Sequence, residues 1–343
     1  MGRHGDDVVT AAISAVEYFL PEGTLTNEDL SDAFPEWTVD KIAAKTGIHT
    51  RHIVSEGETS SDLAIRAAEK LFAINGVDRS TIDFVILCTQ SPDFSMPSTA
   101  GIVQHSLGLR VGIGATDINL GCSGYVYALG LAKGLVESSQ AKSVLVLTVD
   151  TYSRYVNPGD KSVRTLFGDG ASASLITGVE GPDRLYGFTY GTDGNGAKSL
   201  IVPNGGLRSG QTLAPKSSTA ERQLQSNGFD LYMDGPAIFN FTLDVVPKTV
   251  ASILERADLS LDDVDLFVFH QANAYMLEHL RKKLGIEESK FFVSLEKSGN
   301  TVSSTIPIAL SEAQMQGRLQ SGMKIMLLGF GVGLSWGGLI VSW

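Results

Sequence analysis

Short apolar runs rich in β-branched residues alternate along the chain with longer segments in which apolar residues recur at helical spacing. The short runs predict strands at Asp83–Leu87, Ser143–Val149, Asp265–Phe269 and Lys324–Leu328. The longer segments predict helices at Ser60–Phe72, Gly124–Ser138 and Ala274–Leu284. This alternation is typical of α/β proteins, and the nearly continuous apolar character of the strands favours sheets that are covered on both faces.

Two pairs of segments recur in the same order in the two halves of the chain. Ile82–Ile86 (IDFVI) matches Val264–Val268 (VDLFV) in residue type at each position. Phe167–Ile176 (FGDGASASLI) is similar to Phe330–Ile340 (FGVGLSWGGLI). Two matches in the same order favour a duplication over a chance similarity of strands. We therefore expect two similar βαβ-type halves, residues 1–178 and 179–343.

The composition fits a chain that buries a substantial core. It has 343 residues, of which 43% are hydrophobic and 19% charged, and this length favours about two domains. No apolar run reaches the ~18 residues of a membrane-spanning helix, and the first residues lack the pattern of a secretory signal. Only Cys88 and Cys122 are present, which gives no disulfide framework and favours a cytoplasmic location.

The charge narrows the range of partners. A formal net charge of −11 argues against a nucleic-acid partner, because binding phosphates requires an excess of Lys and Arg. It also disfavours a general attraction to an acidic carrier protein, so such docking would depend on a local basic patch.

Cys122 is the candidate nucleophile. A strand-like segment runs into Gly121, and a predicted helix starts at Gly124, so Cys122 is expected at a strand-to-helix turn. The partial positive charge of a helix N-terminus would lower the pKa of its thiol. Small neighbours would let a substrate approach and would leave backbone N–H groups free to bind an oxyanion. Cys88 closes an apolar strand and is expected in the core.

His270 and Asn300 complete a candidate acyl-transfer site. His270 ends a predicted strand, where open α/β sheets place their sites, and Asn300 lies in a turn before a helix that begins near Ser304. Papain-like hydrolases also use Cys, His and Asn in this order. The duplicated architecture around Cys122 and the absence of the flanking signature of those proteases disfavour that alternative.

The chain resembles the β-ketoacyl-acyl carrier protein synthase III family of thiolase-fold condensing enzymes. The resemblance runs over almost the full chain and rests on short motifs in the order of the family: Lys45–Ile48 (KTGI), the Cys122 turn, Phe167–Ala171 (FGDGA), His270–Asn273 (HQAN), Ser298–Thr301 (SGNT) and Phe330–Gly333 (FGVG). Thiolases need a second catalytic cysteine and elongating synthases a second histidine, and neither is found here. The resemblance implies an α/β thiolase-like fold with five layers, α-β-α-β-α, and a homodimer.

The resemblance also implies a mechanism. Cys122 would carry the acyl group, and His270 with Asn300 would donate hydrogen bonds to a malonyl thioester during decarboxylative Claisen condensation. The backbone N–H groups of Cys122 and Val332 would form the oxyanion hole. No cofactor and no metal are expected, and the substrates would be acyl-coenzyme A and malonyl-coenzyme A or a malonyl-acyl carrier protein, which makes the carrier protein a partner.

Several positions depart from the pattern of the family. The coenzyme A and substrate site would comprise Lys41, Lys45, Thr46, Met96, Lys161, Gly235 and Asn273. Of these, Lys41 replaces a tryptophan of the family, for which Trp37 could compensate. Lys45 and Lys161 replace arginines. Met96 replaces a phenylalanine that limits the acyl pocket. Val332 replaces a glycine, and Tyr275 replaces a carrier-docking arginine, leaving Arg281, Lys282 and Lys283 as the basic patch.

These changes keep open a second function, that of a non-condensing acyltransferase that passes the acyl group to an alcohol or amine. A degenerate, inactive scaffold is disfavoured because all three catalytic residues are present.

Overall fold

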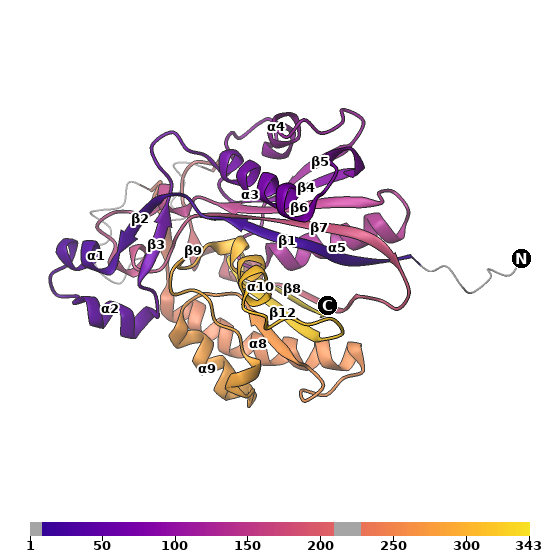
Figure 1. Cartoon of the computed structure of the whole chain (residues 1–343). Coiled ribbons are helices and arrows are strands. Elements are labelled where there is room, and N and C mark those ends of the chain that lie inside the picture. Colours follow the sequence, from indigo (N-terminus) through magenta and orange to yellow (C-terminus); the bar gives the residue numbers. More distant parts are fainter. Residues whose placement is uncertain (1–8, 209–227) are drawn as a thin grey trace, which may run out of the picture.

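Two β-sheets, one from each half, form the framework of the computed structural model, which describes residues 9–208 and 228–343 (Figure 1). The first sheet contains β1 (Val9–Phe19), β4 (Phe84–Cys88), β5 (Gly114–Ile118), β6 (Ser143–Asp150) and β7 (Gly170–Glu180). The second contains β8 (Leu185–Thr192), β11 (Leu266–Phe269), β12 (Lys324–Gly331) and β13 (Ser335–Ser342). Residues 1–8, on which the expectation of no secretory signal partly rests, lie outside the described residues.

Nine α-helices and four short strands complete the described part of the chain. The helices are α1 (Asn27–Ala33), α2 (Val39–Thr46), α3 (Ser60–Asn75), α4 (Thr99–Ser106), α5 (Gly124–Glu137), α6 (Lys161–Arg164), α8 (Gly235–Ala257), α9 (Ala274–Leu284) and α10 (Thr305–Met315). The short strands pair as β2 (Gly23–Thr26) with β3 (Thr50–Ile53), and as β9 (Leu200–Ile201) with β10 (Tyr232–Met233). The predicted strands and helices are therefore confirmed, with shifts of one to three residues at their ends.

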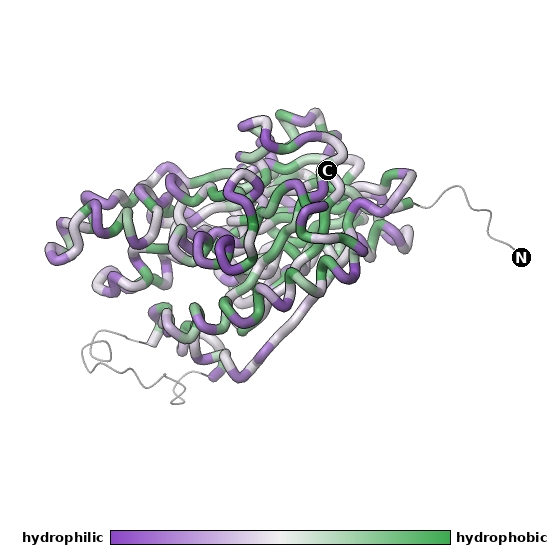
Figure 2. Tube along the Cα trace, turned by 90° about the horizontal axis from the view of Figure 1, so that it is seen from below, coloured by the Kyte–Doolittle hydropathy of each residue, from purple (hydrophilic) through white to green (hydrophobic). Residues whose placement is uncertain are grey.

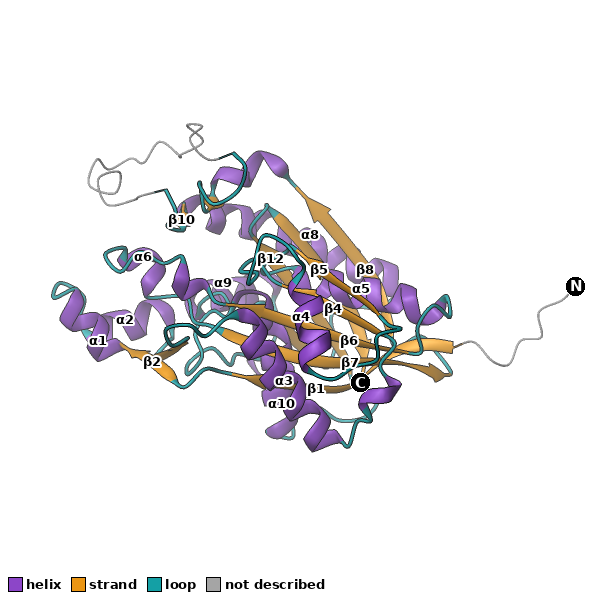
Figure 3. Cartoon of the chain, turned by 90° about the horizontal axis from the view of Figure 1, so that it is seen from above, coloured by secondary structure: helices purple, strands orange, loops and turns teal. Residues whose placement is uncertain are grey.

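The elements stack in five layers, as predicted. Helices α3 and α4 cover the outer face of the first sheet (Figure 3). Helices α5 and α10 lie between the sheets and contact both, and α8 covers the outer face of the second sheet with α9 beside it (Figure 1). The apolar segments gather in the middle of the molecule, and the polar ones lie toward its periphery (Figure 2). All eight positions of β6 are buried, because helices pack on both faces of its sheet.

The sheet topology repeats between the halves. The strand order β1-β7-β6-β4 corresponds to β8-β13-β12-β11, and each corresponding pair of neighbours runs in the same relative sense. The counterpart of β5 is reduced to an isolated parallel bridge between Phe267 and Phe291. The two pairs of matching segments fall on β4 with β11 and on β7 with β13. The predicted boundary after residue 178 cuts the last residues of β7, and the turn between the halves is residues 181–184.

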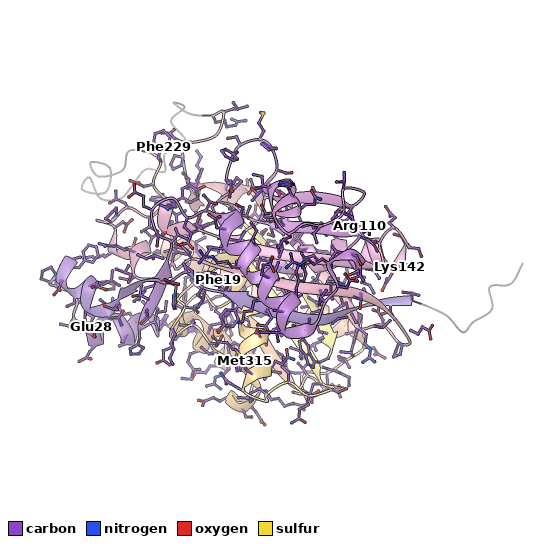
Figure 4. All side chains as sticks on the ribbon, turned by 45° about the horizontal axis from the view of Figure 1, so that its top comes forward. Phe19, Glu28, Arg110, Lys142, Phe229 and Met315 are labelled. Carbon is purple, nitrogen blue, oxygen red and sulfur yellow. The ribbon has the colours of Figure 1, made fainter. Side chains whose placement is uncertain are left out.

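The carboxyl ends of the parallel strands point toward α1 and α2. Arg110 and Lys142 lie at the opposite end of the first sheet from Glu28 of α1 (Figure 4). There Asp83, just before β4, accepts a hydrogen bond from the Lys142 N–H at 2.8 Å and pairs with Arg110. Cys122, described below, follows β5 at the other end of this sheet, where α/β proteins usually place their sites.

Helix α8 is the one helix within residues 9–208 and 228–343 that is long and apolar enough to cross a membrane. Its exposed residues recur every three to four positions and are mostly polar, and they include Asn240, Asp244 and Lys248. Its opposite side packs on β8, β13 and β12. This pattern is that of a surface helix packed against a sheet.

Candidate active site

The three predicted catalytic residues line one cavity between the two halves. Cys122 lies two residues before α5, Asn300 lies five residues before α10, and His270 directly follows β11. Because α5 and α10 are the corresponding central helices, Cys122 and Asn300 hold equivalent places in the two halves. The cavity has a volume of about 200 Å³, and all three residues are buried. The structure thus brings together residues that are up to 178 positions apart in sequence (300 − 122).

The second half of the chain packs directly against Cys122. A Cβ atom added at Gly331 would lie 2.8 Å from the Cys122 Sγ atom. One added at Gly329 would lie 2.5 Å from the Cys122 carbonyl oxygen. Both glycines belong to β12, so this strand can pass so close to the cysteine only because these positions lack side chains.

The predicted low pKa of the Cys122 thiol is wrong for the free protein. Burial raises this pKa to about 12, and the Asp150 carboxylate adds to the rise. Hydrogen bonding from the backbone of Val332 and of Cys122 itself lowers the pKa, but by less. The thiol is therefore protonated at neutral pH, and its proton must be removed as it attacks.

His270 is placed to be the neutral partner of this thiol. Burial lowers the pKa of its imidazole to about 3, so the ring is uncharged at physiological pH. Its Nδ1 atom lies 2.7 Å from the Thr305 hydroxyl, which leaves Nε2 for the cavity. The same hydroxyl lies 3.1 Å from the carbonyl oxygen of Val302. When the hydroxyl donates to Nδ1, Nε2 carries the proton and is a donor; when it donates to Val302, Nε2 is an acceptor.

Replacement of Thr305 by valine is expected to slow turnover about tenfold. Thr305→Val removes the only hydrogen-bonding partner of the His270 Nδ1 atom within the described residues, so the ring loses its orientation and its tautomer control. The measurement is kcat together with the unfolding temperature. Thr242→Val is the matched control, because Thr242 is also buried and helical, and in the described part of the chain its hydroxyl bonds to the Ile238 carbonyl alone. Equal loss of kcat in both variants would contradict the role of Thr305.

The side-chain amide of Asn300 has a fixed orientation. Its Oδ1 atom accepts a hydrogen bond from the backbone N–H of Val302 at 2.9 Å, so the NH₂ group is free to donate into the cavity. Val302 has a φ of 55°, an uncommon value for a β-branched residue and a feature that concentrates at functional sites. The backbone of Asn300 is tied to the first half by bonds with Leu166 (2.9 Å) and Gly168 (3.0 Å).

Six of the seven residues predicted to bind coenzyme A or substrate divide into three groups, and Met96 is described separately below. Gly235 and Asn273 line the cavity. Lys41, Lys45 and Lys161 surround the ring of Trp37, with Nζ atoms 5.5, 4.8 and 5.8 Å from its centroid. Thr46, by contrast, is buried.

Thr46 is a buried residue of α2 whose hydroxyl is engaged on both its donor and its acceptor side within the fold. Its hydroxyl donates to the Ile42 carbonyl at 2.8 Å and accepts from the Ile48 N–H at 3.0 Å. Thr46 therefore ends helix α2 and does not face a ligand, which corrects the prediction for this residue.

Met96 does not reach the site within a single chain. Its side chain is 82% exposed, and it lines neither the Cys122 cavity nor the neighbouring one. The prediction that Met96 limits the acyl pocket therefore fails for the isolated chain.

The expected basic patch on α9 is partly neutralised. Arg281 and Lys282 both pair with Glu278, and the Lys283 ammonium donates to the Leu243 carbonyl. Tyr275 stacks on Phe239, which lines the cavity, so the rim of the cavity carries aromatic residues next to these cations. Within residues 9–208 and 228–343, no group of three or more His, Cys, Asp or Glu side chains could hold a metal ion.

Sequence reasoning missed two residues of this site. Thr305 looks like an ordinary helical threonine, and nothing in its neighbourhood signals a bond to His270. Asp150 ends the fully buried strand β6, and an acidic residue at the end of an apolar run was a usable signal.

Comparisons with known proteins identify the family. Residues 116–194 match the family described as 3-oxoacyl-[acyl-carrier-protein (ACP)] synthase III, and residues 254–343 match its C-terminal part. The β-ketoacyl-[acyl-carrier-protein] synthase III of Streptococcus suis is 40% identical over 334 residues, which are 97% of this chain and 98% of that protein. The synthase III of Caldanaerobacter subterraneus subsp. tengcongensis is 35% identical over 338 residues, 98% of each chain.

Solved structures give the same answer. A crystal structure of a 3-oxoacyl-(acyl-carrier-protein) synthase III has a TM-score of 0.93 at 49% identity, and the match covers 97% of this chain and 100% of that one. The 3-oxoacyl-(acyl-carrier protein) synthase of Burkholderia xenovorans LB400 has a TM-score of 0.90 at 35% identity, with 97% and 94% covered. The chain therefore belongs to the 3-oxoacyl-[acyl-carrier-protein] synthase III family and is a thiolase-fold condensing acyltransferase.

Proposed function

We propose that Cys122, His270 and Asn300 carry out the two half-reactions of this enzyme, acylation of a cysteine and decarboxylative condensation with a malonyl thioester. The observation that carries the proposal is the single buried cavity that the three side chains share. A thiol, a neutral imidazole and an amide NH₂ group converge there, and this set can accept a proton and can donate hydrogen bonds to an enolate.

In the first half-reaction, Cys122 attacks the carbonyl carbon of an acyl thioester. A new carbon–sulfur bond forms to Sγ, and the bond to the donor's sulfur breaks. The thiol proton passes by way of the neutral His270 ring to the departing thiolate. The backbone N–H groups of Cys122 and Val332 bind the oxyanion; their hydrogen bonding to the Cys122 sulfur supports this assignment.

In the second half-reaction, the malonyl thioester loses its carboxylate as carbon dioxide. The electron pair of the broken bond forms an enolate, whose oxygen accepts hydrogen bonds from the Asn300 NH₂ group and the His270 Nε2–H group. The enolate carbon then attacks the acyl carbonyl, and Sγ leaves as a thiolate that takes up a proton. Burial of the cavity strengthens these hydrogen bonds.

The proposal is tested by following the two half-reactions separately. Intact-mass measurement after incubation with an acyl-coenzyme A should show one acyl adduct, on Cys122. Addition of malonyl-coenzyme A or a malonyl-carrier protein should then release one carbon dioxide per acyl group consumed. Adduct formation without carbon dioxide release, with transfer to an alcohol or amine instead, would identify the non-condensing acyltransferase.

The surroundings of Trp37 support coenzyme A as the acyl donor. The indole ring offers a stacking surface for a nucleobase. The three lysine ammonium groups beside it suit phosphates, one of which would replace Glu36 in its ion pair with Lys161. Helix α2, which ends beside this cluster, packs on the start of α9, where a Cβ atom at Gly47 would lie 2.3 Å from the Ala274 Cβ atom. The adjacent Asn273 lines the cavity, so the cluster lies next to its entrance.

Replacement of Trp37 by alanine is expected to raise KM for acyl-coenzyme A about tenfold, since one base stack is worth about 1–3 kcal/mol. The kcat value should stay within about twofold of the wild type, because Trp37 lies outside the cavity. The control is the same measurement with acyl-pantetheine, which lacks the nucleotide and should show no change in KM. An equal rise in KM for both substrates would contradict nucleotide stacking on Trp37.

We place the acyl chain in a second cavity of about 500 Å³ that adjoins the first, because Leu200 lines both. Its walls include Tyr152, Leu231 and Val332, and its volume exceeds that of an acetyl group. Competition among acyl-coenzyme A substrates of increasing length is expected to favour groups longer than acetyl.

We also propose that the protein is a homodimer that pairs through β5. Among the strands of residues 9–208 and 228–343, β5 pairs with β4 alone, and its other edge is open to a partner. Exposed apolar residues flank it, namely Phe94, Met96 and Val111. A dimer would cover them and would bring Met96 close to the acyl cavity of the partner.

Sedimentation should therefore give about twice the 36.6 kDa mass of the chain. Thr116, at the middle of β5, would face its own copy near a twofold axis, so Thr116→Asp is expected to weaken association about tenfold by opposing like charges. Thr24→Asp, an exposed change on β2, is the matched control. A monomeric wild type, or equal behaviour of the two variants, would contradict pairing through β5.

The malonyl donor and the cellular setting follow from the relatives. Their names specify an acyl carrier protein, so we propose a carrier protein as the partner that presents the malonyl group at the cavity entrance. We further propose that the enzyme acts in the cytoplasm, in the synthesis of fatty acids or related acyl chains.

A further inference from the structure

Asp150 is a buried carboxylate that neither half-reaction uses. It ends β6, and its exposed fraction is 0%. Its Oδ1 atom accepts a hydrogen bond from the Gln90 N–H at 2.8 Å. Its Oδ2 atom accepts one from the Ser303 N–H at 3.1 Å and another from the Ser303 hydroxyl. Gln90 follows β4 in the first half, and Ser303 follows Asn300 in the second, so one carboxylate joins loops from both halves.

Both of these loops touch the nucleophile's turn. A Cβ atom added at Gly121, just before Cys122, would lie 2.5 Å from the Gln90 Oε1 atom and 3.2 Å from the Val302 Cγ1 atom. Val302 precedes Ser303 and donates the bond that orients Asn300. The carboxylate therefore holds one end of the positive-φ turn that fixes the amide of Asn300.

A carboxylate is an electrostatically poor choice for this place. Burial raises the pKa of Asp150 to about 7, with hydrogen bonds from Ser303 and Gln90 acting in the opposite direction. Its charge also raises the pKa of Cys122 and opposes the enolate that forms during condensation. Its benefit is geometric. Only a carboxylate has two acceptor oxygens, and here they accept from three donors, the Gln90 N–H, the Ser303 N–H and the Ser303 hydroxyl. An asparagine would turn its NH₂ group toward one of the backbone N–H groups.

We propose that Asp150 is a positioning residue for condensation: by bonding the loops of Gln90 and Ser303, it holds the Asn300 amide where it donates to the malonyl thioester oxygen. The inference rests on the proposed function of Asn300. It assigns Asp150 no contact with substrate, so its loss slows the second half-reaction and does not slow the first.

The test compares the half-reactions in Asp150→Asn. Condensation on pre-acylated enzyme is expected to fall about 30-fold, since small misplacements of a catalytic group cost up to about 100-fold. Acylation of Cys122 by acyl-coenzyme A should fall by no more than about threefold, because loss of the Asp150 charge lowers the pKa of the Cys122 thiol. Ser303→Ala, which removes one of three bonds, should lower condensation about fivefold. Equal losses in the two half-reactions of Asp150→Asn would overturn the proposal.

Asp169→Asn is the matched control for loss of a buried carboxylate. Asp169 is also fully buried and accepts bonds from the Ser153 N–H (2.9 Å), the Ser153 hydroxyl and the Val54 N–H (2.8 Å). Its partners belong to the first half alone and do not line the cavity. This variant is expected to unfold at a lower temperature and to keep the wild-type ratio of condensation to acylation rates.

A double-variant cycle isolates the route through Asn300. Asp150→Asn combined with Asn300→Ala should condense within about twofold of Asn300→Ala alone, because Asp150 acts through that amide. Independent, multiplied losses would overturn the proposal.

A measurement that does not depend on catalysis tests the role of Asp150 separately from the proposed function. A wild-type acyl-enzyme that releases no carbon dioxide would contradict condensation. In that case the NMR resonance of the Asn300 side-chain amide, which is assigned by its loss in Asn300→Ala, still tests whether Asp150 positions that amide. It should shift or broaden in Asp150→Asn and stay unchanged in Asp169→Asn, and an unchanged resonance in Asp150→Asn would overturn the inference.

Discussion

Cys122→Ala is expected to abolish the acyl adduct and to lower overall turnover by at least about 10⁴-fold, the scale on which removal of a nucleophile acts. The alanine side chain fits a site where Gly331 lies against the cysteine, so the variant should fold normally. The measurements are intact mass after incubation with an acyl-coenzyme A, the rate of product formation, and the unfolding temperature.

Cys88→Ala is the control for this experiment. Cys88 is the other cysteine of the chain, is fully buried, and its Sγ atom bonds to the Leu120 carbonyl. Its removal is expected to cost about 1 kcal/mol of stability through the small cavity it leaves, and the acyl adduct should persist. An adduct that disappears with Cys88 and survives loss of Cys122 would reverse the assignment.

Asn300→Asp is expected to lower condensation about 10³-fold, because it replaces the donating NH₂ group by an oxygen that repels the enolate. A carboxylate oxygen can still accept the bond from the Val302 N–H, so the turn itself is retained. The measurement is carbon dioxide release by enzyme that already carries its acyl group. Acylation of Cys122 should fall by no more than about tenfold, since Asn300 takes no part in that step.

Asn300→Ala separates the two roles of the Asn300 side chain, hydrogen-bond donation to the enolate and acceptance of the bond from Val302. It removes both the NH₂ group and the acceptor for Val302, so it tests the combined loss. If Asn300→Asp condensed at a rate near that of the wild type, the amide would be serving the turn alone, and the enolate would need another donor.

The repeated pattern of apolar strands and amphipathic helices determined the fold class. Residue types at Ile82–Ile86 and Val264–Val268 record the duplication, and these segments became the corresponding strands β4 and β11. The motifs around Cys122, His270 and Asn300 identified the family and the cavity residues, because each motif sits where a strand or turn leads into a helix. Local sequence suffices for such features, since turn chemistry and periodicity act over a few residues.

Properties set by distant residues were not predictable in this way. The thiol pKa of Cys122 was expected to be low from its helix terminus, but packing of the second half over it removes water and raises the pKa. Thr46 matches a motif, yet its hydroxyl is used within α2. Met96 fits an acyl pocket by alignment but is exposed in the single chain.

The sequence by itself therefore determined the duplicated architecture and the family, and it predicted the three side chains that line the cavity. Only the tertiary structure decided how those side chains are charged and oriented. The Thr305 partner of His270, the Val302 bond to Asn300 and the Asp150 link between loops depend on where separate segments meet. Hydrogen bonds and burial act through space, so the ionisation and aim of each group follow from contacts that no local stretch of sequence contains.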